Sequence, residues 1–226
     1  MTSYPPYQLK NLARTIEMQV PQKALRDALN RMRYGPNAPR SDERIYINPS
    51  QVTRLFKRIK GHSLRRRHSG QIRAGDWDQS TVSLDESRKF RACRAHFVDG
   101  VSWEDTGIID SVLASVAKNG NFDGCKTRED ILARYQRMDA LHDAIKSAGR
   151  LQTMSERPEF FRREYDGVYV HIDRGGQPML AGNGNHRMAI AKVLGLASIP
   201  AHLGVIHPLA FENGVLDVLR QPPPGD

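Results

Sequence analysis

The chain has few cysteines and no long apolar run, and each shortage excludes a class of protein. Two of its 226 residues are cysteines, Cys93 and Cys125, too few for the disulfide framework of a small secreted domain. Neither has a His or Cys partner at metal-site spacing, so we expect both to be reduced and buried. No stretch approaches the roughly 18 apolar residues of a transmembrane helix, and residues 1–7 lack a signal-peptide core. We therefore expect a cytoplasmic protein without a membrane span.

Acidic residues are also in short supply. The chain has 34 Lys and Arg against 25 Asp and Glu, a net charge of +9, which favours an acidic partner such as DNA, a nucleotide or a phosphorylated small molecule. Residues 54–73 contain no acid and one aromatic residue, Phe56, so a base-stacking platform is not indicated. This basic run can contact phosphates, or it can be a solvated surface whose acids lie elsewhere in the fold. Its cations are Arg54, Lys57, Arg58, Lys60, Arg65, Arg66, Arg67 and Arg73.

The most informative stretch is a glycine-rich turn between a short apolar strand end and an apolar helix, residues 180–200. A helix N-terminus leaves backbone N–H groups unpaired and carries about half a positive charge, which suits an anion. Arg187 adds a planar donor fork for phosphate, and His186 adds a titratable donor. The stretch predicts a phosphate-binding corner. The alternative is that the glycines are present only because the backbone of the turn requires them. The predicted corner consists of Gly182, Asn183, Gly184, Asn185, His186 and Arg187.

This stretch resembles the ParB/sulfiredoxin superfamily, in which a strand, a Gly-rich turn ending in His-Arg or Arg-Arg, and a helix form a nucleotide phosphate site. The resemblance covers about residues 140–207, and the segment Gly70–Asp78 with the helix after it resembles an arrangement in uncharacterised members. Members include DNA-partitioning CTPases, sulfinic acid reductases, free-serine kinases and nucleases. The matching positions are Asn183, Gly184, Asn185, His186, Arg187, Ala189, Ile190, Ala191, Lys192, Leu194, Gly195, Ile199 and Pro200.

Departures from the family pattern narrow these activities. Asn185 stands where sulfiredoxins carry their catalytic cysteine, and an amide cannot form the thiolate that this chemistry requires. Asn183 stands where the kinase-like members carry an Asp, so the charge and basicity of that position are lost. The stretch after the core, Pro208–Asp226, is too short for the helix-turn-helix and dimerisation tail of a chromosome-partitioning member. We therefore expect neither a sulfinic acid reductase nor a chromosome-partitioning protein. The role of the kinase Asp is in doubt at Asn183.

A second group of candidate residues follows the basic run. Asp76 and Asp78 flank Trp77, and two acids two apart on an extended segment point the same way. They could hold Mg²⁺ together with water and phosphate oxygens. The alternative is a turn in which the Asp side chains bond nearby N–H groups while Trp77 packs inward. Asp76, Asp78 and His186 are the candidate catalytic residues.

The pattern of helix and strand signals predicts an α+β protein with a small mixed sheet. A short strand from Ile45 is expected to end at Pro49, and Ser50 can cap a helix to Ile59. Thr127-Arg-Glu-Asp130 has the form of a capping box, and Gly149 can end the helix that it opens. The other expected elements are helices at 8–33, 85–97, from 102 to about 119 and 187–194, and strands at 45–49, 168–173, 177–181 and 199–206.

We expect the chain to be organised around one ParB/sulfiredoxin-like core. The expected divisions are a helical N-terminal extension at 1–40, a segment at 41–84 with the first strand, the basic run and the Gly-Asp-Trp-Asp turn, a helical insertion at 85–127, the core at 128–210 and a tail at 211–226. The leading hypothesis is a protein that binds ATP or CTP, as a di- or triphosphate with Mg²⁺, for phosphoryl transfer or nucleotide hydrolysis. The rival is a DNA-binding or nuclease-like module that uses the basic run.

Overall fold

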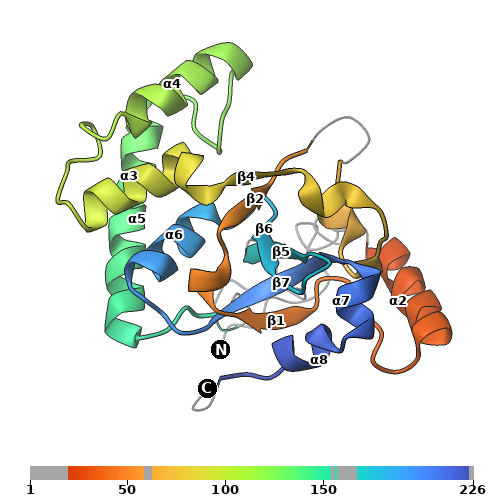
Figure 1. Cartoon of the computed structure of the whole chain (residues 1–226). Helices are drawn as coiled ribbons and strands as arrows, with labels where there is room; N and C mark the ends of the chain where they lie inside the picture. Colours follow the sequence, from red (N-terminus) through yellow and green to blue (C-terminus); the bar gives the residue numbers. More distant parts are fainter. Residues whose placement is uncertain (1–19, 59–62, 154–155, 157–166, 224–226) are drawn as a thin grey trace, which may run out of the picture.

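The computed structural model describes residues 20–58, 63–153, 156 and 167–223 and shows a mixed sheet with helices packed around it (Figure 1). This confirms the expected mixture of helices and a mixed sheet. The strands are β1 (Arg44–Ile47), β2 (Arg54–Phe56), β3 (Gln71–Ile72), β4 (Thr81–Ser83), β5 (Val168–Ile172), β6 (Pro178–Leu180) and β7 (Ile199–Ile206). The helices are α2 (Val20–Tyr34), α3 (Arg88–Phe97), α4 (Ile108–Asn119), α5 (Arg128–Ala148), α6 (Asn185–Val193), α7 (Pro208–Glu212) and α8 (Val215–Leu219). Short 3-10 turns lie at Pro49–Gln51, Arg66–His68, Asp76–Gln79 and Leu84–Glu86.

The seven strands of the described residues form one sheet in the order β1-β7-β5-β6-β2-β4, with β3 paired to the far end of β7. β5 runs parallel to β7, and β2 runs parallel to β6. The pairs β1–β7, β5–β6 and β2–β4 are antiparallel. Every residue of β5 and β7 is buried, as expected for apolar strands at the centre of a sheet covered on both faces. Four strands come from 41–84, so this segment is part of the same sheet as the expected core.

The β5–β6 hairpin leads directly into α6, as the sequence predicts. Val170 pairs with Leu180 and Ile172 with Pro178. α6 begins at Asn185, two residues before the expected start, and buries Met188 and Ile190 against the sheet. The chain then returns as β7 beside β5. The glycine turn therefore lies at one edge of the sheet, at the start of a buried helix.

A layer of helices covers α6 on its outer side. Figure 1 shows α3 and α5 beside α6 and α4 farther out against α3 and α5, while α7, α8 and α2 lie at the opposite side of the sheet. The expected capping box opens α5: the Thr127 side chain accepts from the Asp130 N–H, and the Asp130 side chain accepts from the Thr127 N–H. Gly149, with a φ of 66°, ends the helix. Both helix-end signals in the sequence are confirmed.

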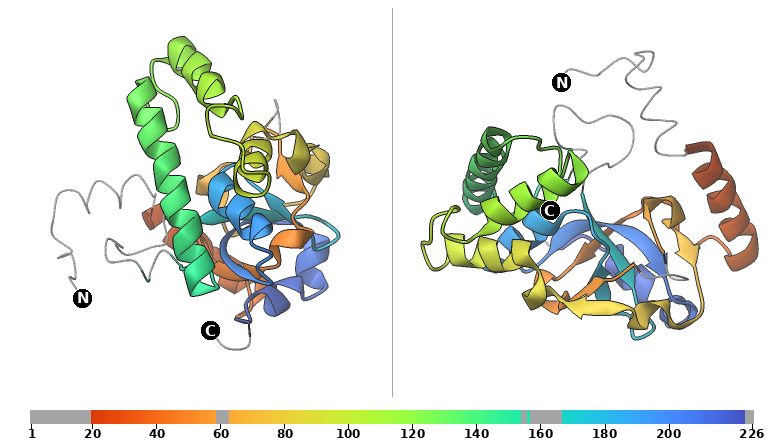
Figure 2. Two further views of the ribbon diagram at one scale, coloured as in Figure 1. Left: turned by 90° about the vertical axis from the view of Figure 1, so that its left-hand side faces the viewer. Right: turned by 90° about the horizontal axis from the view of Figure 1, so that it is seen from above.

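Helix α2 packs through its polar face on the loops around residues 40 and 70. The Lys23 ammonium forms a buried ion pair with Asp42 at 2.7 Å, and Asn30 donates to the carbonyls of Pro39 and Gly70. The apolar stripe of this helix is exposed, and Met32 is 83 % accessible. Figure 2 shows α2 at one end of the molecule, away from α3, α4 and α5. The first part of the expected helix at 8–33, up to residue 19, lies outside the described residues.

The expected helix from Ser50 to Ile59 is wrong. Asn48, not Ser50, caps a single turn at Pro49–Gln51, and the chain then extends as β2. Leu55 of β2 pairs with Leu180 of β6, and hydrogen bonds from α6 hold the preceding turn. Sheet pairing therefore overrides the local helix signal.

The segment expected to be a tail contains a packed helix, because Leu216 of α8 is buried and Arg220 pairs with Glu43. Both cysteines are free and buried. Among the described residues, no helix has the length and apolar character needed to cross a membrane.

Candidate functional site

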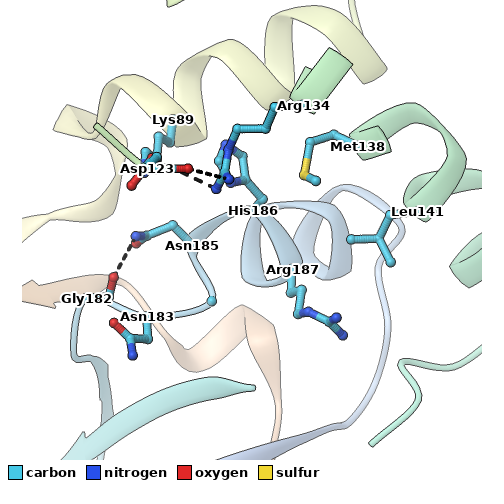
Figure 3. Close-up of a pocket in the computed structure, with 11 residues that line it drawn as sticks. Lys89, Asp123, Arg134, Met138, Leu141, Gly182, Asn183, Asn185, His186 and Arg187 are labelled. Atoms are coloured by element: carbon cyan, nitrogen blue, oxygen red, sulfur yellow. Dashed lines mark hydrogen bonds and ion pairs between the residues drawn. The ribbon is translucent and has the colours of Figure 1, made fainter. Parts of the chain in front are cut away.

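The glycine turn opens onto a pocket of about 340 Å³ between α6 and the outer helices (Figure 3). The pocket brings together every residue of the predicted phosphate-binding corner and adds residues from α3, α5 and the loop before α5. Its lining consists of Lys89, Asp123, Arg134, Met138, Leu141, Gly182, Asn183, Gly184, Asn185, His186 and Arg187. The sequence therefore located one wall of this pocket, and the helical layer supplies the other.

Close packing of the backbone fixes the shape of the glycine turn. Gly182 and Gly184 have φ values of +94° and +78°. A Cβ at Gly184 would lie 2.6 Å from the Cα of Val168, so the turn sits directly against the start of β5. The Asn185 side-chain amide donates to the Gly182 carbonyl at 2.9 Å and closes the turn (Figure 3). Gly184 caps α6 without a side-chain hydrogen bond, so the first turn of the helix faces the pocket with its N–H end.

Two cations that sequence reasoning missed face this turn from the helical layer. Lys89 lies in the first turn of α3, and Arg134 lies on α5. Both interact with Asp123: the Lys89 ammonium donates to its carboxylate, and the Arg134 Nη1 donates to its main-chain oxygen at 2.8 Å. Burial alone would raise the pKa of Asp123, but the hydrogen bond and charge of Lys89 outweigh burial and lower the pKa. Asp123 is therefore an anion held at the edge of a cationic pocket.

A signal for Arg134 was present in the sequence. It occupies the stripe of α5 that includes Ile131, Tyr135, Met138 and Leu141, and an arginine within an apolar stripe lies beside buried surface. No comparable local pattern marks Lys89, because its position at the pocket depends on how α3 packs against α6.

His186 is buried and uncharged at neutral pH. Burial, together with the nearby charges of Lys89 and Arg134, lowers its pKa to about 3. The residue is 7 % accessible, and its Nε2 has no hydrogen-bond partner among the described residues. The ring of Tyr135 meets the imidazole edge-on at 5.6 Å. His186 therefore lines the pocket as a neutral imidazole with a buried Nε2, and it is not the group titrating near neutral pH that the sequence suggested.

Arg187 lies between two cavities. It lines the main pocket, and it also lines a small cavity with Gly167 and His202 on the other side. Figure 3 shows its side chain running away from the group formed by Lys89, Asp123 and Arg134. Lys89 and Arg134 therefore form one cationic side of the pocket, and Arg187 borders it from α6 with its side chain pointing away from them (Figure 3).

Asp76 and Asp78 are held by an arginine. Arg174, in the β5–β6 hairpin, donates to Asp78 through Nε and Nη2, each at 2.7 Å, and to Asp76 through Nη2 at 2.7 Å. Trp77 is buried and donates to the Arg73 carbonyl. Trp77 packs inward, as in the alternative to a Mg²⁺ site, but the two aspartates bond a distant arginine and not the nearby N–H groups that this alternative predicted. Among the residues that the structure describes, neither aspartate lines the pocket, and no cluster of three or more His, Cys, Asp or Glu residues could hold a metal.

The basic run is divided between internal pairs and exposed side chains. Arg54 pairs with Asp173, and the Arg66 Nε lies 3.6 Å from the Asp42 carboxylate. The exposed cations of the run are Lys57, Arg58, Arg65, Arg67 and Arg73, whereas Lys60 lies outside the described residues.

Arg58 of the basic run lies beside the glycine turn. Because β2 and β6 run parallel, the chain leaving β2 and the chain leaving β6 emerge at the same edge of the sheet. A Cβ at Gly182 would lie 3.3 Å from the Arg58 Nη2.

Comparisons with protein-family models, curated proteins and solved structures gave no match to this chain.

Proposed function

We propose that this chain is a ParB/sulfiredoxin-like protein that binds the phosphates of a nucleotide, ATP or CTP, in the pocket at the N-terminus of α6. One observation carries the proposal. Lys89 and Arg134 face a glycine turn and the N–H end of a buried helix across a pocket of about 340 Å³. Cationic side chains and a helix N-terminus both favour a multiply charged anion over a neutral ligand.

The walls of the pocket suit the two ends of a nucleotide. Pockets for small molecules usually have volumes of about 300 to 1,000 Å³, and this pocket lies within that range. Met138 and Leu141 provide an apolar wall on α5, against which a base can pack. The side-chain amides of Asn183 and Asn185 lie at the turn and supply polar groups (Figure 3). The phosphates would then lie between the turn and the cations.

The catalytic part of the hypothesis is phosphoryl transfer or nucleotide hydrolysis. Such reactions depend mainly on positioning the phosphates and neutralising their charge, which this set of residues can do. Mg²⁺ would enter with the nucleotide, since its sites commonly use one or two protein carboxylates together with phosphate oxygens. Asp76 and Asp78 are paired with Arg174, and the Asp123 carboxylate at the pocket is paired with Lys89.

The test measures binding of ATP, CTP and inorganic tripolyphosphate by calorimetry, for the native protein and for Arg187→Ala. We expect the variant to bind about 1–3 kcal/mol more weakly, the range for loss of a hydrogen bond to a charged group. Arg73→Ala is the matched control, because Arg73 is an exposed arginine that does not line the pocket. Equal affinity of native protein and Arg187→Ala would remove Arg187 from the site, and no binding of any of the three probes would contradict the proposal.

The second candidate is contact with DNA through the basic run. The observation in its favour is Arg58, an exposed arginine whose guanidinium lies against Gly182. Counterion release makes such binding fall steeply with salt. A gel-shift series across salt concentrations, run beside the nucleotide titrations, separates the two functions: tight duplex binding without a nucleotide response favours DNA.

A further inference from the structure

Asp123 places a carboxylate at the position where a phosphate would meet the helical layer. Its Oδ2 accepts from the Lys89 ammonium and lies 4.0 Å from the Arg134 Nη2 (Figure 3). The Asp123 side chain is 27 % accessible and lines the pocket, so a ligand can reach it. The carboxylate is thus both bound and accessible.

The backbone at Asp123 is held in an uncommon conformation. Its φ is +54°, one of two positive values at non-glycine residues in the described chain. Gly124 follows with a φ of +81°, and Phe122 pairs with Cys125 across this tight turn. Left-handed backbone is costly for residues other than glycine, although aspartate tolerates it better than most. This is the backbone of a two-residue Asp-Gly hairpin turn, and it fixes the position from which the Asp123 side chain reaches the two cations.

The two cations need an anion whether or not a ligand is bound. Lys89 and Arg134 are 19 % and 28 % accessible at their side chains, so water screens them only in part. A partly buried cation without a counter-charge is destabilising. A phosphate oxygen and a carboxylate oxygen satisfy the same N–H donors, so the two compete for one position.

We propose that Asp123 is a built-in counter-anion, which occupies an anion subsite in the empty pocket and is displaced from Lys89 when the phosphate of the ligand enters. This inference rests on the proposed function and adds a regulatory element to the same site. The exchange requires only rotation of the Asp123 side chain. Arg134 donates to the main-chain oxygen of Asp123 as well, so the turn stays anchored while the carboxylate leaves. Binding is therefore an exchange of anions. A weakly charged ligand does not displace the Asp123 carboxylate from Lys89, whereas a multiply charged phosphate does.

The test compares Asp123→Asn with the native protein, using inorganic tripolyphosphate as the probe. Without ligand, the variant should melt at a lower temperature, because two cations lose their counter-charge. Tripolyphosphate should bind the variant about tenfold more tightly and raise its melting temperature by more than it raises that of the native protein, because no carboxylate competes. Asp110→Asn is the matched control: it removes an exposed carboxylate from α4 and should behave as the native protein does.

A second variant guards against misfolding of the first. Asp123→Gly removes the carboxylate and relieves the positive φ, while the main-chain oxygen that Arg134 contacts remains. It should show the same gain in affinity with a smaller loss of melting temperature. Equal or weaker tripolyphosphate binding by both variants, with binding intact in the native protein, overturns this inference and leaves the proposed function standing. No binding of tripolyphosphate, ATP or CTP by any of the proteins rejects both.

Discussion

Individual residues of the glycine turn serve packing as much as binding. Gly184 has a left-handed backbone, and the main chain of Val168 lies where its Cβ would be. The residue is needed for the turn to fit against β5, whatever the ligand. Gly182 faces the Arg58 guanidinium instead. The two glycines of one motif therefore have different physical roles, which the sequence pattern does not distinguish.

Gly184→Ala should destabilise the protein more than an ordinary glycine substitution at a helix end. The left-handed backbone costs about 1–2 kcal/mol for an alanine, and the 2.6 Å contact with Val168 adds to that cost. Gly195→Ala is the control, because Gly195 has a φ of +63° and no atom within 4 Å of an added Cβ. Urea unfolding of both variants measures the difference. Equal free energies of unfolding for the two variants would contradict the close packing of the turn.

The candidate site was predictable from the sequence only where its residues are neighbours along the chain. Residues 182–187 follow one another, so a strand end, two glycines and a helix start were enough to locate them. Lys89 and Arg134 reach the same pocket from α3 and α5, and only the packing of helices brings them there. The arginine that holds Asp76 and Asp78 also comes from a distant hairpin. Pairing between charges far apart in the chain has no local signature.

Among the secondary-structure elements, α2 shows an inverted pattern. A helix on a globular protein usually buries its apolar stripe, whereas α2 buries Lys23 and exposes Leu25, Leu29 and Met32. The loops around residues 40 and 70 supply the partners of this polar face. The Asp42 carboxylate accepts from Lys23, and main-chain carbonyls of both loops accept from Asn30. Hydrophobic periodicity alone would therefore assign the wrong face of this helix to the contact with the rest of the protein.

Lys23→Ala should weaken the attachment of α2 to the loops around residues 40 and 70. Lys23 and Asp42 are both 2 % accessible at their side chains, and removal of one partner of a buried pair typically costs about 3–5 kcal/mol. Leu29→Ser, on the exposed face of the same helix, should change the free energy of unfolding by less than about 0.5 kcal/mol. Chemical denaturation of the two variants tests this order. A larger loss for Leu29→Ser would mean that the apolar face is covered.

Elements with local signals were predicted well, and elements defined by their partners were not. The β5–β6 hairpin, the capping box of α5 and strand β7 follow from neighbouring residues. Strand β2 was mistaken for a helix because its conformation comes from pairing with β6 and β4 on either side. Without strand β2, the sequence did not indicate that residues 41–84 belong to the same sheet as residues 168–206.

On the scale of the whole molecule, the sheet and its helices bury four histidines of the described chain: His171, His186, His202 and His207. His171, His186 and His202 are each 7 % accessible or less. Burial is the main cause that lowers the pKa of each to about 3, and positive side chains nearby add to the effect. His171 also has a structural role, since its Nδ1 accepts from the Val205 N–H at 3.0 Å beside the bare backbone of Gly204. The folded protein therefore holds these imidazoles neutral well into the acid range.

Stability should fall as the pH is lowered from 7.5 to 5.5. An unfolded histidine titrates near its ordinary pKa of about 6.5, whereas the folded groups resist protonation until about pH 3. Between these values the unfolded chain binds more protons, so the stabilisation is complete above about pH 6.5 and is lost toward acid. Each histidine contributes a loss of about 1.4 kcal/mol by pH 5.5, or about 4 kcal/mol for the three. Urea unfolding at pH 7.5, 6.5 and 5.5 measures how the free energy of unfolding changes with pH. In His171→Asn this change should be smaller by the contribution of one histidine, about 1.4 kcal/mol. The same free energy of unfolding at pH 7.5 and 5.5 would show that the three imidazoles take up protons in the folded state as readily as in the unfolded chain.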